Sequence, residues 1–585
     1  MTIIPEFFMQ MLRREPVLAL LVGIFLALGV WQSTYHYGFP TVVGDEPPPM
    51  VAALKMIGEG MIRPAFPTFY YMPVSAYAAI PFAALGLAYH GVVDGFTSLD
   101  EVRRFVVVDF AELLPFARVG SVIFGVIDIL LWYQIVYMIF EQRRRALLAA
   151  YLLAASLLFF QITHFGKVWS LHIAFIMMSL LYTTKIWKGE QTMRNYLLAS
   201  LGAILAFGVN IIGSVVWSAL LFVHLLVADG GIVRRLFSRK IVAAFSLFLI
   251  GITLMSLINP YGFGNNWRYV ENFFGIFARG VSIQASIPNY SEPVVSRTWD
   301  WGYYPKIMLE YDPILVLFSV LGLYAILRRE RALLLWMSGW TLVYYVGVTM
   351  ISGAKDVLYE PRYALPLYLL ATLLGAVSLS NIATSIEQRS RFVAKSVLVV
   401  FVVVYALVPL LWAERIERVG TRELALQWVK EMIPSGSRIM VFDDYLPVPE
   451  NTEGISFVQR STPQFMTVRR SWMLEHPEDI PVPGYVVYHP NYMRDGKLSD
   501  LSGTRVEYVI HGYFDPAVYR AEKERIQELF PDAQMSEVAR FPATAGDDRE
   551  SLDLPNNMRS PFFRLWGNDY NGPVVVIDKV TYGEH

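Results

Sequence analysis

The sequence predicts a polytopic α-helical membrane protein that ends in a small α/β domain. Of its 585 residues 55% are hydrophobic and only 17% are charged, and the mean hydropathy is +0.41, which is too apolar for a soluble chain of this length. The charge is also uneven, because residues 414–585 carry 46 of the 99 charged side chains. We therefore expect a transmembrane domain over 1–413 and an extracytoplasmic soluble α/β domain over 414–585.

Eleven apolar segments approach the roughly 20 residues that a helix needs to cross a bilayer. The first follows Arg13 and Arg14 and is not trailed by a small-x-small cleavage site, so we expect a retained anchor with a cytoplasmic N-terminus. The eleven segments are 16–33, 119–140, 146–163, 170–187, 195–211, 213–228, 241–258, 313–327, 332–350, 363–381 and 396–413.

A twelfth apolar run, 74–91, contains prolines and glycines, and we expect it to lie at the outer interface rather than to cross. With that choice five basic clusters fall on the cytoplasmic side, as the positive-inside rule requires. The clusters are Arg143 to Arg145, then Lys185, Lys188 and Arg194, then Arg234, Arg235, Arg239 and Lys240, then Arg328, Arg329 and Arg331, and finally Arg389, Arg391 and Lys395. The long segments 34–118 and 259–312 and the tail then face outward.

The tail has the pattern of an α/β domain. Helical spacing of apolar residues is found in 421–434 and 517–530. Residues 436–443 have the pattern of a turn that leads into a strand. Short apolar runs typical of strands also begin at Val486, Val506 and Val574.

Two classes of function are excluded by composition. The chain has no cysteine, so it has no disulfide, no thiolate metal site and no cysteine nucleophile. Residues 1–413 have a net charge of +7 and the tail −8, and neither shows the basic surface of a nucleic-acid-binding protein.

Candidate site residues begin with Asp45 and Glu46, which lie shortly after the first apolar segment and directly before three prolines. Adjacent carboxylates near a membrane surface are costly and need partners or a function. Two compatible interpretations stay open, since an Asp before a proline-started helix is also an ordinary helix cap. Tyr70 and Tyr71 follow in an aromatic, proline-rich stretch, either as interfacial belt residues or as a surface for sugar stacking.

Two further outer segments contain cations. His164-Phe-Gly-Lys167-Val-Trp169 joins the third and fourth segments, where Lys167 either binds an anion or snorkels, and His172 either serves the site or is a hydrogen-bonded core histidine. Asn259-Pro-Tyr leads toward Arg268, and Arg362-Tyr363-Ala-Leu-Pro366 enters the tenth segment. An arginine here either snorkels or presents its planar fork to a phosphate.

Together and in this order, these motifs resemble those of the GT-C fold membrane glycosyltransferases, in particular the protein O-mannosyltransferase and lipid A aminoarabinose transferase superfamily. Asp45-Glu46 resembles the acidic pair of the first outer loop, and the His164 to Lys167 element resembles a His-aromatic-small-Arg/Lys motif. The segments at Asn259 and Arg362 resemble an Asn-Pro-aromatic and an Arg-Tyr-x-x-Pro motif. Two departures are Trp169, where the family commonly has Asp, and Tyr70-Tyr-Met-Pro73 in place of His-Pro-Pro or Tyr-Pro-Pro.

The resemblance implies an inverting transferase that moves a sugar from a polyprenyl-phosphate donor to a protein, lipid or glycan acceptor on the outer face of a bacterial or archaeal plasma membrane. It implies Asp45 as the base, with Glu46 supporting the site or binding acceptor. Arg362, Lys167, His164 and Arg268 are the expected ligands of the donor phosphate. The expected substrate-lining residues are Tyr70, Tyr71, Tyr363, Trp169 and His172.

No cofactor is firmly implied, no metal ligands are assigned, and a divalent metal ion is not indicated by any motif. Two alternatives stay open. A relative that has lost catalysis and binds glycans or acts as a scaffold would explain Trp169. A transporter would show repeated halves with broken helices at matching positions, and the sequence shows no such repeat.

Overall fold

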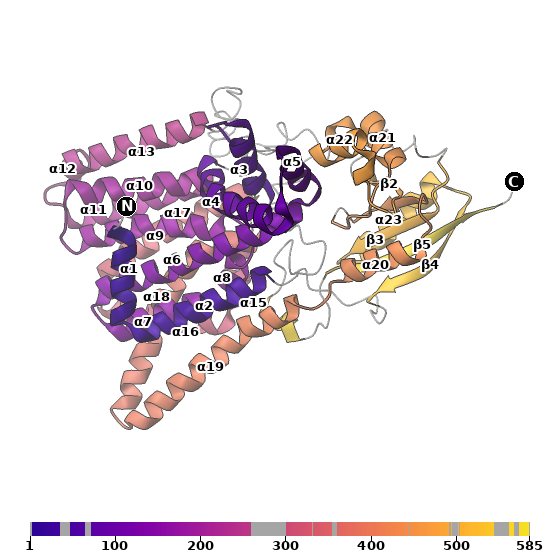
Figure 1. Ribbon diagram of the computed structural model, residues 1–585. Helices are drawn as coiled ribbons and strands as arrows, with labels where there is room; N and C mark the ends of the chain where they lie inside the picture. The colour runs from indigo at the N-terminus through magenta and orange to yellow at the C-terminus, as the bar shows by residue number, and fades with distance from the viewer. Residues whose placement is uncertain are drawn as a thin grey trace.

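The computed structural model describes residues 3–34, 47–64, 72–258, 300–329, 331–353, 360–443, 445–490, 493, 501, 504–542, 561–566 and 572–583. These residues form a bundle of long helices with a smaller α/β domain at one end (Figure 1). The expected fold class, a polytopic helical membrane part followed by a C-terminal α/β domain, is confirmed.

The helical part contains both long helices and short irregular turns. Its α-helices are α1 (Ile3–Arg14), α2 (Pro16–Thr34), α3 (Pro47–Glu59), α4 (Pro73–His90), α5 (Leu99–Val108), α6 (Leu114–Phe140), α7 (Arg143–Ala154), α8 (Leu157–Thr163), α9 (Trp169–Trp187), α10 (Met193–Val209), α11 (Trp217–Val227), α12 (Ile232–Leu236), α13 (Arg239–Ile258), α15 (Tyr303–Tyr311), α16 (Pro313–Arg329), α17 (Arg331–Gly353), α18 (Leu365–Glu387) and α19 (Arg391–Ile416). The short turns are η1 (Gly91–Gly95), η2 (Phe110–Leu113), η3 (Ile211–Val216) and η5 (Pro361–Ala364).

Within the described residues, seven helices are long and apolar enough to cross a membrane, or up to nine if each bent pair counts as one span. The predicted number of eleven is therefore not confirmed. Two predicted spans, 195–211 and 213–228, correspond to the shorter apolar helices Met193–Val209 and Ile211–Val227. The run that we expected at the interface is one of the seven, as Pro73–Gly95, so its length and composition also permit a crossing.

The predicted span 146–163 is a broken helix, and a second break directly precedes the predicted span 313–327. Between α7 and α8 the axis bends by 62°, and between α15 and α16 it bends by 114°. Pro313 starts α16, and a proline at this position cannot supply the N–H that would continue the preceding helix. The breaks are joined by Asp312, whose carboxylate accepts a 3.0 Å hydrogen bond from the backbone N–H of Leu157 at the start of α8.

The basic clusters gather at one end of the bundle. Arg144 donates two hydrogen bonds to Glu387 at the end of α18, at 2.9 and 2.5 Å, and Lys188 at the end of α9 bonds Glu141 at 2.9 Å. Figure 1 shows α12 and the start of α7 at this end, while the α/β domain lies at the opposite end. The basic clusters and the C-terminal domain therefore lie at opposite ends of the helical bundle.

The C-terminal domain is built on a five-stranded mixed sheet in the described residues, with strand order β2-β1-β3-β5-β4. The strand β1 is parallel to β2 and β3, whereas β5 is antiparallel to β3 and β4. The strands are β1 (Arg438–Val441), β2 (Val486–Tyr488), β3 (Tyr508–Tyr513), β4 (Ala533–Phe541) and β5 (Val574–Tyr582). The helices are α20 (Thr421–Met432), α21 (Thr452–Ser461), α22 (Val468–Glu475) and α23 (Pro516–Leu529), with the short turns η6 (Pro463–Phe465), η7 (Pro477–Asp479) and η10 (Phe562–Trp566).

The four strands and two helices predicted for the tail are present, as β1, β2, β3, β5, α20 and α23. The strand β4 was missed. It is an edge strand in the order above, and apart from Ala533 its residues are exposed or only partly buried. Its sequence therefore lacks the apolar run that reveals the central strands.

Contacts between the C-terminal domain and the helical part, within the described residues, include an ion pair and a packed turn. Arg104 of α5 forms a 2.6 Å ion pair with Asp479 of η7. The turn η10 packs against α15 and α19, and its Leu565 is fully buried in the core of the helical bundle. The domain thus covers the end of the bundle to which the predicted site residues belong (Figure 1).

Candidate active site

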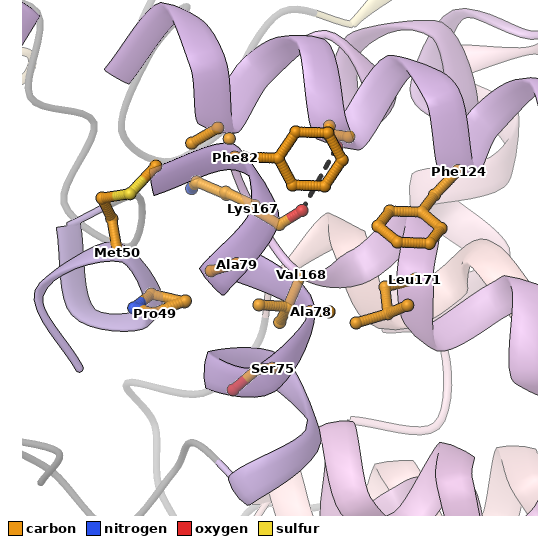
Figure 2. A pocket seen from close by; sticks show the side chains of 14 residues that line it. Pro49, Met50, Ser75, Ala78, Ala79, Phe82, Phe124, Lys167, Val168 and Leu171 are labelled. Carbon is orange, nitrogen blue, oxygen red and sulfur yellow. Dashed lines mark hydrogen bonds between the residues drawn. The ribbon is translucent and has the colours of Figure 1, made fainter. Parts of the chain in front are cut away.

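A pocket surrounds Lys167 at the end of the bundle that faces the C-terminal domain. Its walls come from α3, α4, α6 and the start of α9 and are mostly apolar, with Ser75 and Ser121 as the hydroxyl-bearing residues. Lys167 is only 3% exposed. Figure 2 shows its side chain directed toward Met50 and Pro49 of α3, with Phe82 of α4 close by. A cation held in an apolar pocket is a strong site for an anion, because little water screens it.

The connection between α8 and α9 holds Lys167 in place. The hydroxyl of Ser121 donates a 3.2 Å hydrogen bond to the Lys167 carbonyl and lies 2.8 Å from the Ser170 hydroxyl. Gly166 packs so closely on α6 that a Cβ there would lie 3.0 Å from the Cβ of Ala117. The small residue of this motif is thus needed for the close approach of the connection to α6.

His164 is fully buried in an aromatic environment. Its Nδ1 lies 2.5 Å from the Phe160 carbonyl, one turn earlier in α8. Its ring is 4.0 Å from the Phe160 ring and 6.3 Å from Trp412 of α19, between ring centroids. The structure therefore places His164 as a packed part of the wall, on the same connection as Lys167.

Arg362 lies on η5 and stacks on aromatic rings. Its guanidinium carbon is 5.4 Å from the centroid of the Trp169 ring and 5.8 Å from that of Tyr363. The side chain is 11% exposed and forms an ion pair with Glu360. A guanidinium stacked on a ring keeps its N–H groups in the plane, where a carboxylate or phosphate can bind them.

Trp169 contacts Arg362 and stands close to Lys167 in the sequence. It begins α9 two residues after Lys167, and its ring contacts Tyr363 at 4.9 Å and His172 at 5.5 Å, both edge to face. The structure thus brings together Trp169, His172, Arg362 and Tyr363 from segments about 200 residues apart. The Nδ1 of His172 also donates a 3.2 Å hydrogen bond to the Ala206 carbonyl, so it joins α9 to α10.

Five of the predicted site residues lie outside the described residues, and the structure does not test them. They are Asp45, Glu46, Tyr70, Tyr71 and Arg268. In the sequence, Asp45 and Glu46 directly precede α3, whose first turn contains Pro49 and Met50 of the Lys167 pocket.

Sequence reasoning missed Glu360 and Ser121. Glu360 stands two residues before Arg362, and this short acidic-basic spacing at the entrance of a span was the available signal. Ser121 gave no signal, since a serine in an apolar helix is ordinary. Over the residues that the structure describes, no group of three or more His, Asp or Glu side chains is arranged to hold a metal ion.

The comparisons with known proteins agree with the predicted resemblance. Residues 112–258 match the family model of dolichyl-phosphate-mannose-protein mannosyltransferases. This match covers about a quarter of the chain, includes His164, Lys167 and Trp169, and confirms the resemblance for that segment. Arg362 lies outside it. No curated protein matches the sequence.

Several solved structures are similar to the chain. ArnT from Cupriavidus metallidurans bound to undecaprenyl phosphate has 14% identity, with 96% of this chain and 97% of that chain covered and a TM-score of 0.46. The archaeal oligosaccharyltransferase AglB from Archaeoglobus fulgidus, in complex with an inhibitory peptide and a dolichol-phosphate, has 13% identity, 86% and 70% coverage and a TM-score of 0.40. The arabinofuranosyltransferase AftD from Mycobacteria has 15% identity, 97% and 40% coverage and a TM-score of 0.43.

Proposed function

We propose that this protein is an inverting GT-C fold glycosyltransferase that transfers a sugar from a polyprenyl-phosphate donor to an acceptor on the outer face of the membrane. The observation that carries the proposal is that two cations, Lys167 and Arg362, are nearly buried, with Trp169, two residues after Lys167, under the Arg362 guanidinium. The family match over 112–258 supports the reaction class. We place the transferase domain at 1–413 and the extracytoplasmic domain at 414–585.

The two cations suit a departing lipid phosphate. Breaking the bond between the anomeric carbon and the phosphate oxygen leaves negative charge on the phosphate, and cations already held in place stabilise that charge without reorganising. Arg362 supplies donors in a plane, whereas Lys167 supplies a point charge from an apolar pocket. His164 and Arg268 are weaker candidates for the same phosphate.

The acceptor hydroxyl needs a base, and Asp45 is our candidate, with Glu46 orienting the site or binding acceptor. Inversion requires the acceptor to approach the sugar from the face opposite the phosphate. The walls for the sugar would come from Trp169, Tyr363, His172, Tyr70 and Tyr71, because aromatic faces suit the apolar faces of sugars.

The test is to incubate the purified protein with a panel of polyprenyl-phosphate sugars and to detect released polyprenyl phosphate. The proposal expects release from at least one donor, with strong preference among sugars. If the panel spans the common hexoses and pentoses and no donor is turned over while binding is retained, the catalytically lost relative is the better description.

A further inference from the structure

Asp312 is a buried carboxylate at a place where two broken helices meet. It is 3% exposed and lies between α15 and α16, at the 114° bend. Its Oδ1 accepts hydrogen bonds of 3.0 Å from the Leu157 N–H and of 3.0 Å from the hydroxyl of Tyr405 in α19. A carboxylate inside a membrane bundle is costly to maintain and is a functional candidate by default.

The hydrogen bond from Leu157 to Asp312 holds the start of α8, the helix that leads to Lys167. Leu157 is the first residue of α8, and the residue at the cap position, Ser156, makes no side-chain cap bond. The Ser156 hydroxyl donates instead to the Leu153 carbonyl at 2.9 Å. Asp312, which is 155 residues away in sequence, therefore supplies the acceptor that α8 lacks locally. Since α8 runs directly into the His164 to Lys167 connection, a shift of its start moves Lys167.

Asp312 also lies close to the elements that carry Arg362. The helix α15, which ends next to Asp312, packs against η5. Tyr368 of α18 lies beside the same carboxylate and follows Arg362 by fewer than two helical turns. The hydroxyl of Tyr344 fixes η5 further by donating a 3.0 Å hydrogen bond to the Tyr363 carbonyl. Asp312 thus contacts the structures behind both halves of the candidate site.

We propose that Asp312 is a positioning residue that sets the place of Lys167 relative to Arg362, and that it acts as a hydrogen-bond acceptor rather than through its charge. The effect on turnover rests on the proposed function, whereas the effect on the position of the connection does not. Both observed hydrogen bonds end on Oδ1. An asparagine can therefore replace the carboxylate, and a leucine of similar size cannot.

The first experiment compares Asp312→Leu and Asp312→Asn in steady-state transfer, beside donor binding and thermal unfolding. A displacement of catalytic groups by about 1 Å can cost roughly a hundredfold in rate, so we expect a loss of that order for Asp312→Leu and less than about fivefold for Asp312→Asn. Tyr405→Phe removes one of the two hydrogen bonds to Asp312 and retains the other, so its transfer rate should lie between those of Asp312→Asn and Asp312→Leu. If Asp312→Leu does not fold, Tyr405→Phe should still be slower than Asp312→Asn.

Asp128→Leu is the matched control. Asp128 is also a fully buried carboxylate in the bundle, on α6, but neither of its oxygens has a hydrogen bond to the described residues. Replacing it removes a buried carboxyl group without releasing a partner, so turnover should stay within about twofold of the wild type. An equal loss in Asp128→Leu and Asp312→Leu, or an Asp312→Asn variant as impaired as Asp312→Leu, would overturn the proposal.

A second experiment does not depend on activity. The chain has no native cysteine, so Val168→Cys places one reactive thiol in the wall of the Lys167 pocket, where Val168 is half-buried. Asp312→Leu should change the labelling rate of this thiol by a water-soluble maleimide at least several-fold, whereas Asp312→Asn and Asp128→Leu should not. Unchanged labelling in Asp312→Leu contradicts the positioning role. If the labelling changes as expected but no donor is turned over by the wild type, the positioning stands and the proposed reaction fails.

Discussion

Replacing Arg362 by lysine should impair transfer although the charge is kept. The guanidinium is 11% exposed, pairs with Glu360 and stacks on Trp169. A lysine can still lie over the indole ring, but it cannot present two parallel N–H groups to a phosphate. The main loss is thus one charge-assisted hydrogen bond in a site with little solvent screening, which costs about 1.5–3 kcal/mol.

At 1.36 kcal/mol for each tenfold change in rate, this loss corresponds to about a 10- to 150-fold decrease in kcat/KM. If the bond to phosphate strengthens as the glycosidic bond breaks, kcat should fall as well as donor affinity. The assay is steady-state transfer from a short-chain polyprenyl-phosphate sugar, beside direct donor binding by the folded variant.

Arg328→Lys is the control for this prediction. Arg328 also stacks on an aromatic ring, with its guanidinium carbon 4.3 Å from the centroid of Tyr324, but it belongs to a basic cluster at the other end of the bundle. Its replacement should leave transfer unchanged. Arg362→Lys with wild-type rate and affinity would reduce Arg362 to an anchor at the helix entrance and refute the phosphate assignment.

The remaining predictions concern the base, the second cation, the membrane sides and the C-terminal domain. Asp45→Asn should abolish transfer while donor binding persists, because an amide cannot take the acceptor proton; near wild-type turnover removes Asp45 from the mechanism. Lys167→Arg should lose less activity than Arg362→Lys, since arginine provides more donors than the lysine it replaces, and the reverse order of the two rates contradicts this. In intact cells an impermeant thiol reagent should label Glu528→Cys on α23 and not Arg389→Cys after α18; the opposite pattern inverts the topology. Burial, and then the nearby Asp443, raise the pKa of Glu522 to about 8 from an ordinary 4.5. Its neutral form therefore stabilises the fold below pH 4.5, and this contribution is lost as the pH rises through 8. From pH 5 to pH 8 the midpoint of thermal unfolding should decrease less for Glu522→Gln than for the wild type. Equal decreases would show that Glu522 does not cause the loss of stability.

The sequence was sufficient for the features that depend on local pattern. Hydropathy located apolar helices, and the positive-inside rule placed the basic clusters on one side. In the structure Arg144 at the start of α7 bonds Glu387 at the end of α18, and Lys188 after α9 bonds Glu141 after α6. Motif order selected Lys167, Trp169 and Arg362 before their contacts were known. The sequence did not predict which of these residues would touch, because Trp169 and Arg362 are far apart in the chain and only tertiary packing brings them together.

Asp312 illustrates the limit most clearly. In sequence, an aspartate before a proline is an ordinary start of a helix, and nothing local indicates a bond to Leu157 in another helix. The bend between α7 and α8, inside the predicted span 146–163, was missed for the same reason. Hydropathy measures whether a segment is apolar, and a broken helix with a buried acceptor at the break is nearly as apolar as a straight one.

The central claim is that this site releases a lipid phosphate as it transfers a sugar, and the most direct measurement counts both products in one reaction. Purified protein is given a radiolabelled polyprenyl-phosphate sugar and a membrane extract as the source of acceptor, and the transferred sugar and free polyprenyl phosphate are quantified together. The account predicts equal amounts of the two products, inverted anomeric configuration, and loss of both in Asp45→Asn. Donor that binds tightly yet yields neither product with any sugar tested would contradict the account.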